Sequence, residues 1–366
     1  MFFSKRAQWS APLNELTIAR RLQGKRGELL DLTESNPTRA ALPYPHEELA
    51  AALERGAHAS YDPHPRGLRS AREALAEHLR CDVDDLLITA STSEAYSFLF
   101  KLLTDPGDEV LTATPSYPLL EHLASLELVT MRTFAMELHR RWEIHDVPVT
   151  PRTRALIVVN PNNPTGSFVD AREQDALAAL GIPIVSDEVF LDYPLEGRGT
   201  TFVREDVLTF TLGGLSKSAG LPHFKLGWIR VSGPGKAEAL DALELIADNF
   251  LSVATPVQVA LPELLRIAPR IRAAISDRTR ANLVTLRASA KPSMQVLPVE
   301  GGWSAVVRVP RVMSDDELAL ALLDRGVVVQ PGYFFDFASD GYVVLSLLTR
   351  EDVFAEGVRI LAEVFP

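Results

Sequence analysis

The sequence has one cysteine, fewer basic than acidic residues, and no long apolar run. A single cysteine, Cys81, excludes an intrachain disulfide and a thiolate metal site, and we predict no metal site. Cys81 could act as a nucleophile only beside a base, and no neighbour in the sequence supplies one, so we interpret it as a structural thiol. The formal net charge is -11 and the arginines are scattered, so we expect no nucleic-acid partner. No segment is long enough to span a bilayer, and residues 1–13 lack the apolar core of a signal peptide. We therefore expect a cytoplasmic protein with no membrane partner.

The middle of the chain contains short apolar runs that alternate with amphipathic segments. The runs cover residues 86–89, 110–113, 155–159, 182–186, 207–212 and 224–231, and helical patterns cover residues 93–103, 117–126 and 171–180. Such alternation is typical of an α/β fold, in which helices cover both faces of a mostly parallel sheet.

The pattern changes after residue 256. A long helical pattern over residues 257–290 is followed by short β-type runs at residues 296–309, 327–330 and 342–347, with helical patterns at residues 315–325 and after Thr349. This pattern predicts a smaller α+β domain. We expect a large domain at residues 45–255 and a small domain built from residues 1–44 and 256–366.

Polar residues follow three runs of the predicted sheet. Asn163 lies in the turn-rich segment after residues 155–159, Asp187 follows residues 182–186, and Lys217 follows residues 207–212. Ligands of doubly wound sheets bind outside the carboxyl ends of the strands. An amide, a carboxylate and an amine are therefore expected to converge on one crevice.

Pyridoxal 5'-phosphate (PLP) chemistry requires this set of groups. An amine must form a Schiff base with the cofactor and shuttle protons, and a carboxylate must keep the pyridine nitrogen protonated. The phosphate needs hydroxyls, backbone N–H groups at a helix N-terminus, and a cation.

The order and spacing of Asn163, Asp187 and Lys217 resemble those of the class I/II aminotransferases, the aspartate-aminotransferase-like PLP enzymes of fold type I. The resemblance extends over nearly the whole chain, from residues 61–68 to the helix after Thr349. It implies that Lys217 is the Schiff-base lysine, that Asp187 faces the pyridine nitrogen, and that Asn163 donates to the phenolic oxygen of the cofactor.

The same resemblance assigns further cofactor contacts. It implies that Tyr117 stacks on the cofactor ring, and that the phosphate lies at the helix start formed by Ser91, Thr92 and Ser93. Serine and threonine at a helix start are also common as simple caps, which is the structural alternative. Tyr61 matches a tyrosine that reaches the phosphate of the neighbouring subunit, which implies a homodimer with shared active sites.

Four positions depart from the family pattern. Gly214 stands where a phosphate-binding serine is usual, and Lys225 where an arginine is usual, yet glycine permits close backbone approach and lysine keeps the charge. Phe190 replaces a tyrosine whose hydroxyl donates to the phenolic oxygen of the cofactor. Without this hydroxyl, the pKa of the cofactor imine is expected to be higher. Val344 occupies the position of the arginine that binds the substrate α-carboxylate.

Arg39 is our candidate replacement for that arginine. It ends the segment of residues 34–39, which matches the loop that lines the substrate pocket of the family and also contains Asn36. A surface arginine after a turn is the alternative interpretation of Arg39.

The function implied is transfer of an amino group between an amino acid and a 2-oxo acid. A C–S lyase or a decarboxylase on the same fold is the nearest alternative, because the reaction depends on which Cα bond lies perpendicular to the cofactor ring. The effector domain of a transcription regulator is a second alternative. We disfavour it because fewer than about 45 residues precede the large domain and they contain no helix-turn-helix pattern.

Overall fold

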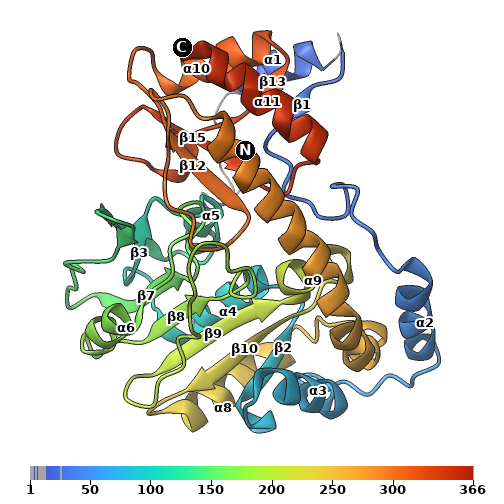
Figure 1. The fold of residues 1–366 in the computed structure, drawn as a ribbon. Coiled ribbons are helices and arrows are strands. Elements are labelled where there is room, and N and C mark those ends of the chain that lie inside the picture. Colours follow the sequence, from blue (N-terminus) through green and yellow to red (C-terminus); the bar gives the residue numbers. More distant parts are fainter. Residues whose placement is uncertain (1–3, 5, 7–13, 25–26, 366) are drawn as a thin grey trace.

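The structure is a computed structural model that describes residues 4, 6, 14–24 and 27–365. Figure 1 shows a larger body built around a twisted sheet and a smaller body beside one end of it. Apart from residues 4 and 6, the segment in which we expected no signal peptide lies outside the described residues. No helix among the described residues is long and apolar enough to cross a membrane.

A seven-stranded sheet forms the larger body. Its spatial order is β2-β10-β9-β8-β7-β3-β4. The strands are β2 (Leu86–Thr89), β3 (Glu109–Thr114), β4 (Thr130–Ala135), β7 (Thr153–Val159), β8 (Ile184–Asp187), β9 (Thr209–Gly214) and β10 (Gly227–Ser232). Only β10 runs against its neighbours, which confirms the expected mostly parallel sheet. The edge strand β4 was not predicted from the sequence, because it is largely solvent-accessible and has no continuous apolar run.

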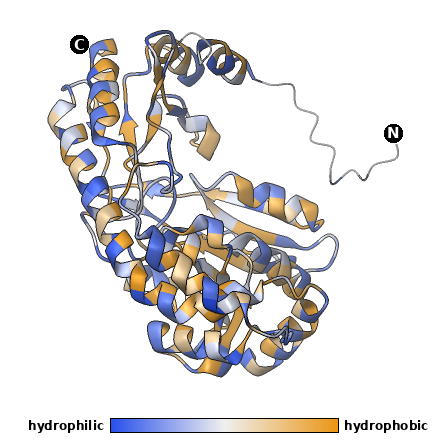
Figure 2. Cartoon of the chain, turned by 90° about the vertical axis from the view of Figure 1, so that its right-hand side faces the viewer, coloured by the Kyte–Doolittle hydropathy of each residue, from blue (hydrophilic) through white to orange (hydrophobic). Residues whose placement is uncertain are grey.

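Helices cover both faces of this sheet. One face packs against α4 (Thr92–Leu103), α5 (Leu119–Leu126) and α8 (Lys236–Asp248). The other packs against α3 (Arg69–Leu79), α6 (Ala171–Ala178) and part of α9 (Thr255–Ser289), with α2 (His46–Ala57) lying against α9. In Figure 2 the helices carry hydrophobic and hydrophilic residues on different sides, as expected for elements that bury one face.

The smaller body contains a four-stranded antiparallel sheet. Its order is β11-β12-β15-β14, with bounds β11 (Gln295–Val296), β12 (Ser304–Arg308), β14 (Gln330–Pro331) and β15 (Tyr342–Ser346). The helices α1 (Glu15–Gln23), α10 (Asp315–Asp324) and α11 (Glu351–Val364) pack around it. The N-terminal segment joins this body through β1 (Leu30–Asp31), which pairs in parallel with β13 (Val327–Val328).

The 35-residue helix α9 runs between the two bodies (Figure 1). Its residues contact α2 and α3 of the larger body and α11 of the smaller one. Pro262 and Pro269 lie inside the helix. The helical pattern over residues 257–290 is thus a single element.

Two boundaries differ from expectation near the site. Gly213 and Gly214 extend β9 beyond the apolar run, because they pair with Trp228 and Gly227 of β10. The Trp228 side chain covers Gly213, where a Cβ would lie 2.5 Å from the indole. Tyr117 precedes its helix, since Pro118 forms the N-cap and α5 begins at Leu119.

Two leucines on α8 test the packing of this core. Leu243 is fully buried, whereas Leu245 is 71% exposed. We expect Leu243→Ala to lower the free energy of unfolding by about 2–5 kcal/mol, because it leaves a cavity. Leu245→Ala should change it by less than about 0.5 kcal/mol. Urea denaturation followed by circular dichroism measures both, and equal losses would contradict the packing described.

Candidate active site

The carboxyl ends of β7, β8 and β9 lie side by side. Val159 of β7 pairs with Asp187 of β8, and the backbone N–H of Asn160 donates to the Asp187 carbonyl at 2.8 Å. The N–H of Glu188 donates to the carbonyl of Leu212 in β9 at 2.9 Å. The segments that carry Asn163, Asp187 and Lys217 therefore leave the sheet at the same edge.

Asp187 is the last residue of β8 and is 7% exposed. The Tyr96 hydroxyl on α4 donates to its Oδ2 at 3.1 Å, and the N–H of Val189 donates to its Oδ1 at 3.2 Å. Burial raises the pKa of Asp187 to about 6, although these two hydrogen bonds and the positive charge of Lys217 act in the opposite direction. The carboxylate is therefore only partly compensated by its protein neighbours.

Lys217 lies on the one-turn helix α7 (Leu215–Ser218), which follows β9 directly. Its Nζ is 5.2 Å from the centre of the Trp303 ring and 5.7 Å from that of Phe190. Burial lowers the pKa of the Lys217 amine, and the charge of Asp187 opposes this effect only in part. The Tyr193 hydroxyl donates to the Lys217 carbonyl at 2.6 Å and so fixes the backbone. A lysine whose pKa is lowered in this way is more readily deprotonated and is then a nucleophile.

Asn163 and Tyr117 lie on the loops that follow β7 and β3. Asn163 is half-buried, and its Oδ1 accepts a hydrogen bond of 3.4 Å from the hydroxyl of Ser304 on β12. Tyr117 is 39% exposed, and the partial burial of its phenol, followed by the negative charge of Asp187, raises its pKa.

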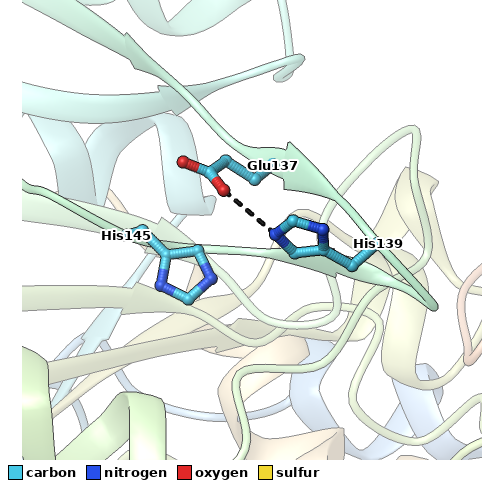
Figure 3. Close-up of side chains that lie close together, drawn as sticks. All are labelled: Glu137, His139 and His145. Carbon is cyan, nitrogen blue, oxygen red and sulfur yellow. Dashed lines mark hydrogen bonds and ion pairs between the residues drawn. The ribbon is translucent and has the colours of Figure 1, made fainter.

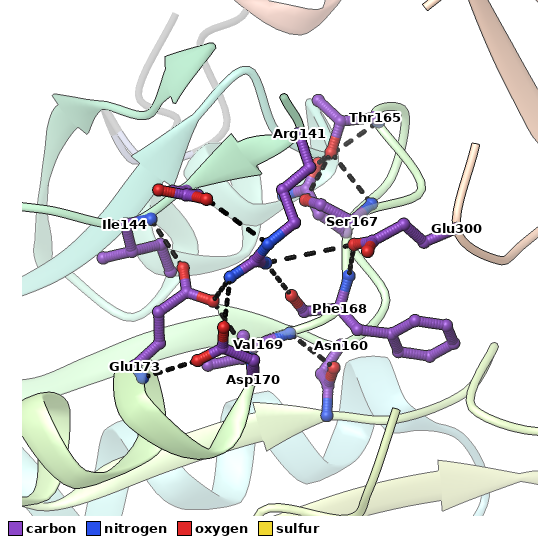
Figure 4. Close-up of polar contacts among 12 residues, drawn as sticks. Arg141, Ile144, Asn160, Thr165, Ser167, Phe168, Val169, Asp170, Glu173 and Glu300 are labelled. Atoms are coloured by element: carbon purple, nitrogen blue, oxygen red, sulfur yellow. Dashed lines mark hydrogen bonds and ion pairs between the residues drawn. The ribbon is translucent and has the colours of Figure 1, made fainter. Parts of the chain in front are cut away.

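A network around Arg141 holds the loop that carries Asn163 (Figure 4). The guanidinium donates to the Phe168 carbonyl at 2.8 Å, to Asp170 at 2.6 Å and to Glu173 at 2.7 Å. The Asn160 side chain closes the other end of the loop, because its Oδ1 accepts from the N–H of Val169 at 3.1 Å. These contacts fix both ends of the segment around Asn163.

The N-terminus of α4 lies close to β9 and β10. Ser91 is the N-cap, and its Oγ accepts from the Glu94 N–H at 3.2 Å. A Cβ on Gly227 would lie 3.0 Å from the carbonyl carbon of Ser91, and one on Gly214 would lie 3.3 Å from the Gly227 Cα. Within the described chain, the backbone N–H groups of Thr92 and Ser93 have no acceptor. The site thus contains free N–H donors beside closely approaching glycines.

Other predicted phosphate contacts lie at the edge of this region or outside it. Ser93 is exposed, whereas Ser91 and Thr92 are half-buried. Lys225 is exposed with φ of 50°, one residue before Leu226, whose carbonyl accepts the N–H of Leu215 at 2.9 Å. Tyr61 is 72% exposed and lines a small surface hollow, away from the residues grouped around Asp187 in this single chain.

The N-terminal loop passes beside the site. Ser346 at the end of β15 holds this loop, because its N–H donates to the Leu32 carbonyl at 2.7 Å. Asn36 uses its Oδ1 to accept from the N–H of Thr38 at 3.1 Å and from its hydroxyl at 2.7 Å. The Arg39 side chain is exposed and makes no hydrogen bond or ion pair with the described residues. The structure therefore does not bring Arg39 into contact with Lys217 or Asp187.

Val344 lies in the middle of β15 and is fully buried. It packs in a cluster with Met136 and Phe335, toward the larger body, whereas its neighbours Val343 and Leu345 pack in the core of the smaller one. The surroundings of Val344 are therefore apolar.

Several residues of the site were missed by the sequence analysis. They are Tyr96, Tyr193, Trp303 and Ser304, together with Glu188, whose pKa burial raises to about 7. Tyr96 had one available signal, since it lies one turn after the helix start at Thr92. The others depend on contacts between segments that are distant in the chain.

The fold and the site define a large α/β protein with a half-buried lysine and a buried carboxylate at the carboxyl edge of its sheet. The sequence matches the family "Aminotransferase class I and II" over residues 27–354. The chain belongs to this family.

Relatives of this chain include several aminotransferases and a lyase. The chain is 29% identical to aspartate/prephenate aminotransferase of Thermus thermophilus, over 99% of this chain and 98% of that protein. It is 30% identical to nicotianamine aminotransferase 1 of Oryza sativa subsp. japonica over 60% of this chain and 49% of the relative. It is 31% identical to S-alkyl-thiohydroximate lyase SUR1 of Arabidopsis thaliana, over 60% and 52% respectively. The chain thus spans about half the length of these plant relatives.

Solved structures agree on the fold. Alanine aminotransferase from Pyrococcus furiosus superposes with a TM-score of 0.87 at 23% identity, over 99% of both chains. Aspartate aminotransferase from Thermus thermophilus with maleate superposes with a TM-score of 0.82 at 26% identity, again over 99% of both. The chain therefore has the fold type I architecture that the sequence predicted.

The raised pKa of Asp187 predicts a pH-dependent stability. The folded protein retains the proton up to about pH 6, whereas an unfolded aspartate loses it near pH 4, so this stabilising contribution is lost as the pH rises from about 4 to about 6. In cofactor-free protein we expect Asp187→Asn to raise the free energy of unfolding at pH 8 by about 1–2 kcal/mol, with a smaller gain at pH 5. Urea denaturation at both pH values measures this.

Asp277→Asn is the control for this prediction, because Asp277 is a highly exposed aspartate on α9. It should leave the stability unchanged at both pH values. An equal gain for Asp187→Asn at pH 5 and pH 8 would show that Asp187 does not titrate as described.

Proposed function

We propose that this protein is a PLP-dependent aminotransferase, which transfers an amino group between an amino acid and a 2-oxo acid. The observation that carries the proposal is the pair of Lys217 and Asp187, a half-buried amine and a buried carboxylate that follow neighbouring strands at the carboxyl edge of the sheet. Family membership and the relatives of known name support the same activity.

The residues present fit the cofactor. Asp187 is a buried carboxylate without full compensation, which a protonated pyridine nitrogen would supply. Trp303 Nε1 and Ser116 Oγ are buried without a hydrogen-bond partner among the described residues, and they adjoin Lys217 and Tyr117 respectively. The free N–H groups at the start of α4 suit a phosphate. Each part of PLP thus has a complementary group.

In the proposed reaction each residue has one task. PLP, when bound, supplies a carbonyl carbon that takes up the amino group and a ring that accepts electrons. Lys217 would hold the cofactor covalently and, once displaced by the incoming amine, move a proton from the substrate Cα. Asp187 would keep the ring nitrogen protonated, and Tyr96 holds Asp187 in place. Asn163 would donate to the phenolic oxygen, and Tyr117 would stack on the ring.

The phosphate site and the assembly belong to the same proposal. Ser91, Thr92, Ser93, Lys225 and the backbone of Gly214 would bind the phosphate. Tyr61, which is largely exposed in one chain, would reach the phosphate of a second copy. We therefore propose a homodimer with shared active sites.

The substrate site is proposed to involve Asn36 and Arg39. Both lie on the N-terminal loop beside β15, and the exposed Arg39 guanidinium has no partner among the described residues. Val344 offers no charge, so an α-carboxylate needs another cation. Closure of this loop over the crevice would supply one.

The division into a large domain at residues 45–255 and a small domain at residues 1–44 and 256–366 is also proposed. Separate sheets in the two parts, and the pairing of β1 with β13, support it. A cytoplasmic location is part of the same proposal, which the single cysteine supports.

A C–S lyase is the second candidate function. The similarity to the lyase of Arabidopsis thaliana favours it over the decarboxylase alternative. Pyruvate and ammonia as products would identify elimination, whereas conversion of the cofactor to its amine form, reversed by a 2-oxo acid, identifies transamination.

Replacement of Lys217 tests the central assignment. We expect Lys217→Ala to lose the visible absorption of covalently held PLP and to lower the rate of transamination by at least about a thousandfold. Lys291→Ala, which alters an exposed lysine far along the chain, should keep both. Absorption spectra of the variant measure the loss of covalently held PLP. Spectra of the wild type, recorded with a panel of amino acids, identify the amino donor. Normal turnover by Lys217→Ala would refute the assignment.

Arg39→Ala tests the carboxylate contact. We expect it to raise the KM for the amino acid by about 10- to 100-fold, as loss of a charged hydrogen bond would. The variant Arg280→Ala removes an exposed arginine of α9 and should leave KM unchanged. Steady-state kinetics with the identified donor measure both. An unchanged KM in Arg39→Ala would remove Arg39 from the site.

A further inference from the structure

A short hairpin lies outside the active site. It consists of β5 (Glu137–Leu138) and β6 (Trp142–Glu143), with Glu137 directly opposite Glu143 and Leu138 opposite Trp142. Like charges that face each other across an antiparallel pair are destabilising. Trp142 is buried and anchors the hairpin. The two carboxylates are therefore held together on a fixed base.

Each carboxylate has a histidine two residues further along the chain. His139 Nε2 is 3.0 Å from Glu137 Oε2, and His145 Nε2 is 3.2 Å from Glu143 Oε2. The two imidazole rings are 6.1 Å apart between centres. One donor atom from each of Glu137, His139 and His145 lies within 4.8 Å of the others, and Figure 3 shows these side chains gathered beside the hairpin.

The sequence, with its single cysteine, predicted no metal site, but the folded chain brings three donor groups together, and we propose that Glu137, His139 and His145 bind a divalent transition-metal ion of the zinc type. Two imidazoles and one carboxylate are a donor set that zinc uses, with water at the fourth position, whereas calcium and magnesium prefer oxygen ligands alone. Ligands about 2.0–2.1 Å from a tetrahedral ion lie roughly 3.3 Å from one another. The His139–Glu137 pair already has nearly that spacing. All three side chains are exposed, so His145 can close the remaining gap by rotation.

The charges around the hairpin favour binding of a metal cation. Glu143 has two partners, since Arg141 Nε lies 3.4 Å from its Oε1 and His145 lies near its Oε2. Glu137 has only His139 among the described residues. A cation at this point would therefore compensate the carboxylate that is less well paired.

A metal ion at this hairpin would restrain Arg141, which holds the loop around Asn163. Arg141 lies between the two strands of the hairpin, and its guanidinium holds Phe168 and Asp170 at the end of the loop around Asn163 (Figure 4). An ion that joins His139 on one side of Arg141 to His145 on the other would restrain this segment. The proposal does not depend on the activity of the enzyme.

Zinc titration tests the proposal directly. Full-length protein without an affinity tag, stripped with a chelator that is then removed, is titrated with zinc chloride by isothermal calorimetry. We expect one ion per chain, and at least about tenfold weaker binding in both His139→Ala and His145→Ala. His58→Ala, at an exposed histidine of another segment, and Cys81→Ala should bind as the wild type does.

Thermal unfolding gives a second readout. Zinc should raise the Tm of the wild type and of His58→Ala, but not that of His139→Ala or His145→Ala, because only an intact site links binding to folding. Absence of a one-to-one binding event in the wild type would overturn the proposal. Equal zinc affinity in the wild type and the two hairpin variants would overturn it as well.

Discussion

The carboxylate of Asp187 is the group on which the arrangement of this site depends. It lies at the end of a central strand, where burial disfavours its charge, and Tyr96, Val189 and Lys217 compensate that charge only in part. A buried carboxylate with partly compensated charge destabilises the protein without a ligand, and a cationic ligand would compensate that charge. The surrounding elements are placed accordingly: α4 brings the tyrosine from one face, and α7 brings the lysine from the adjacent strand.

Close approach of backbones makes this placement possible. Gly213 admits the Trp228 indole against β9, and Gly227 admits the start of α4 against β10. A side chain at Gly213 would displace the Trp228 indole, and one at Gly227 would push β10 away from the start of α4. Gly214 also permits close backbone contact, although it departs from the family pattern. It lacks the hydroxyl expected at this position, yet its small size keeps α7 and β10 in contact.

Much of this could be predicted from the sequence, for identifiable reasons. The strands β7, β8 and β9 are buried along most of their length and rich in apolar residues, and the order Asn163, Asp187, Lys217 after them indicated both fold and family. The half-exposed strand β4 has no continuous apolar run and was missed.

Contacts between segments that are distant in the chain could not be predicted from the sequence either. Trp303 and Ser304 lie on the smaller body and meet Lys217 and Asn163 only because the chain folds back on itself. No local pattern records such a contact. The direction of the Arg39 side chain depends in the same way on how the N-terminal loop lies over the site.

The long helix α9 has a mechanical consequence. At 1.5 Å per residue, its 35 residues form a rod of about 52 Å that is packed into both halves of the molecule. If this helix stays straight, a tilt of about 5° about one end displaces its other end by roughly 4–5 Å. Pro262 and Pro269 each remove a backbone donor and weaken the rod over one short stretch. Bending of α9 is therefore easiest in the half that packs on the large sheet. The second half, from which Arg278 and Asn282 donate to the backbone of Ala40 and Thr349, contains no proline and is the stiffer part.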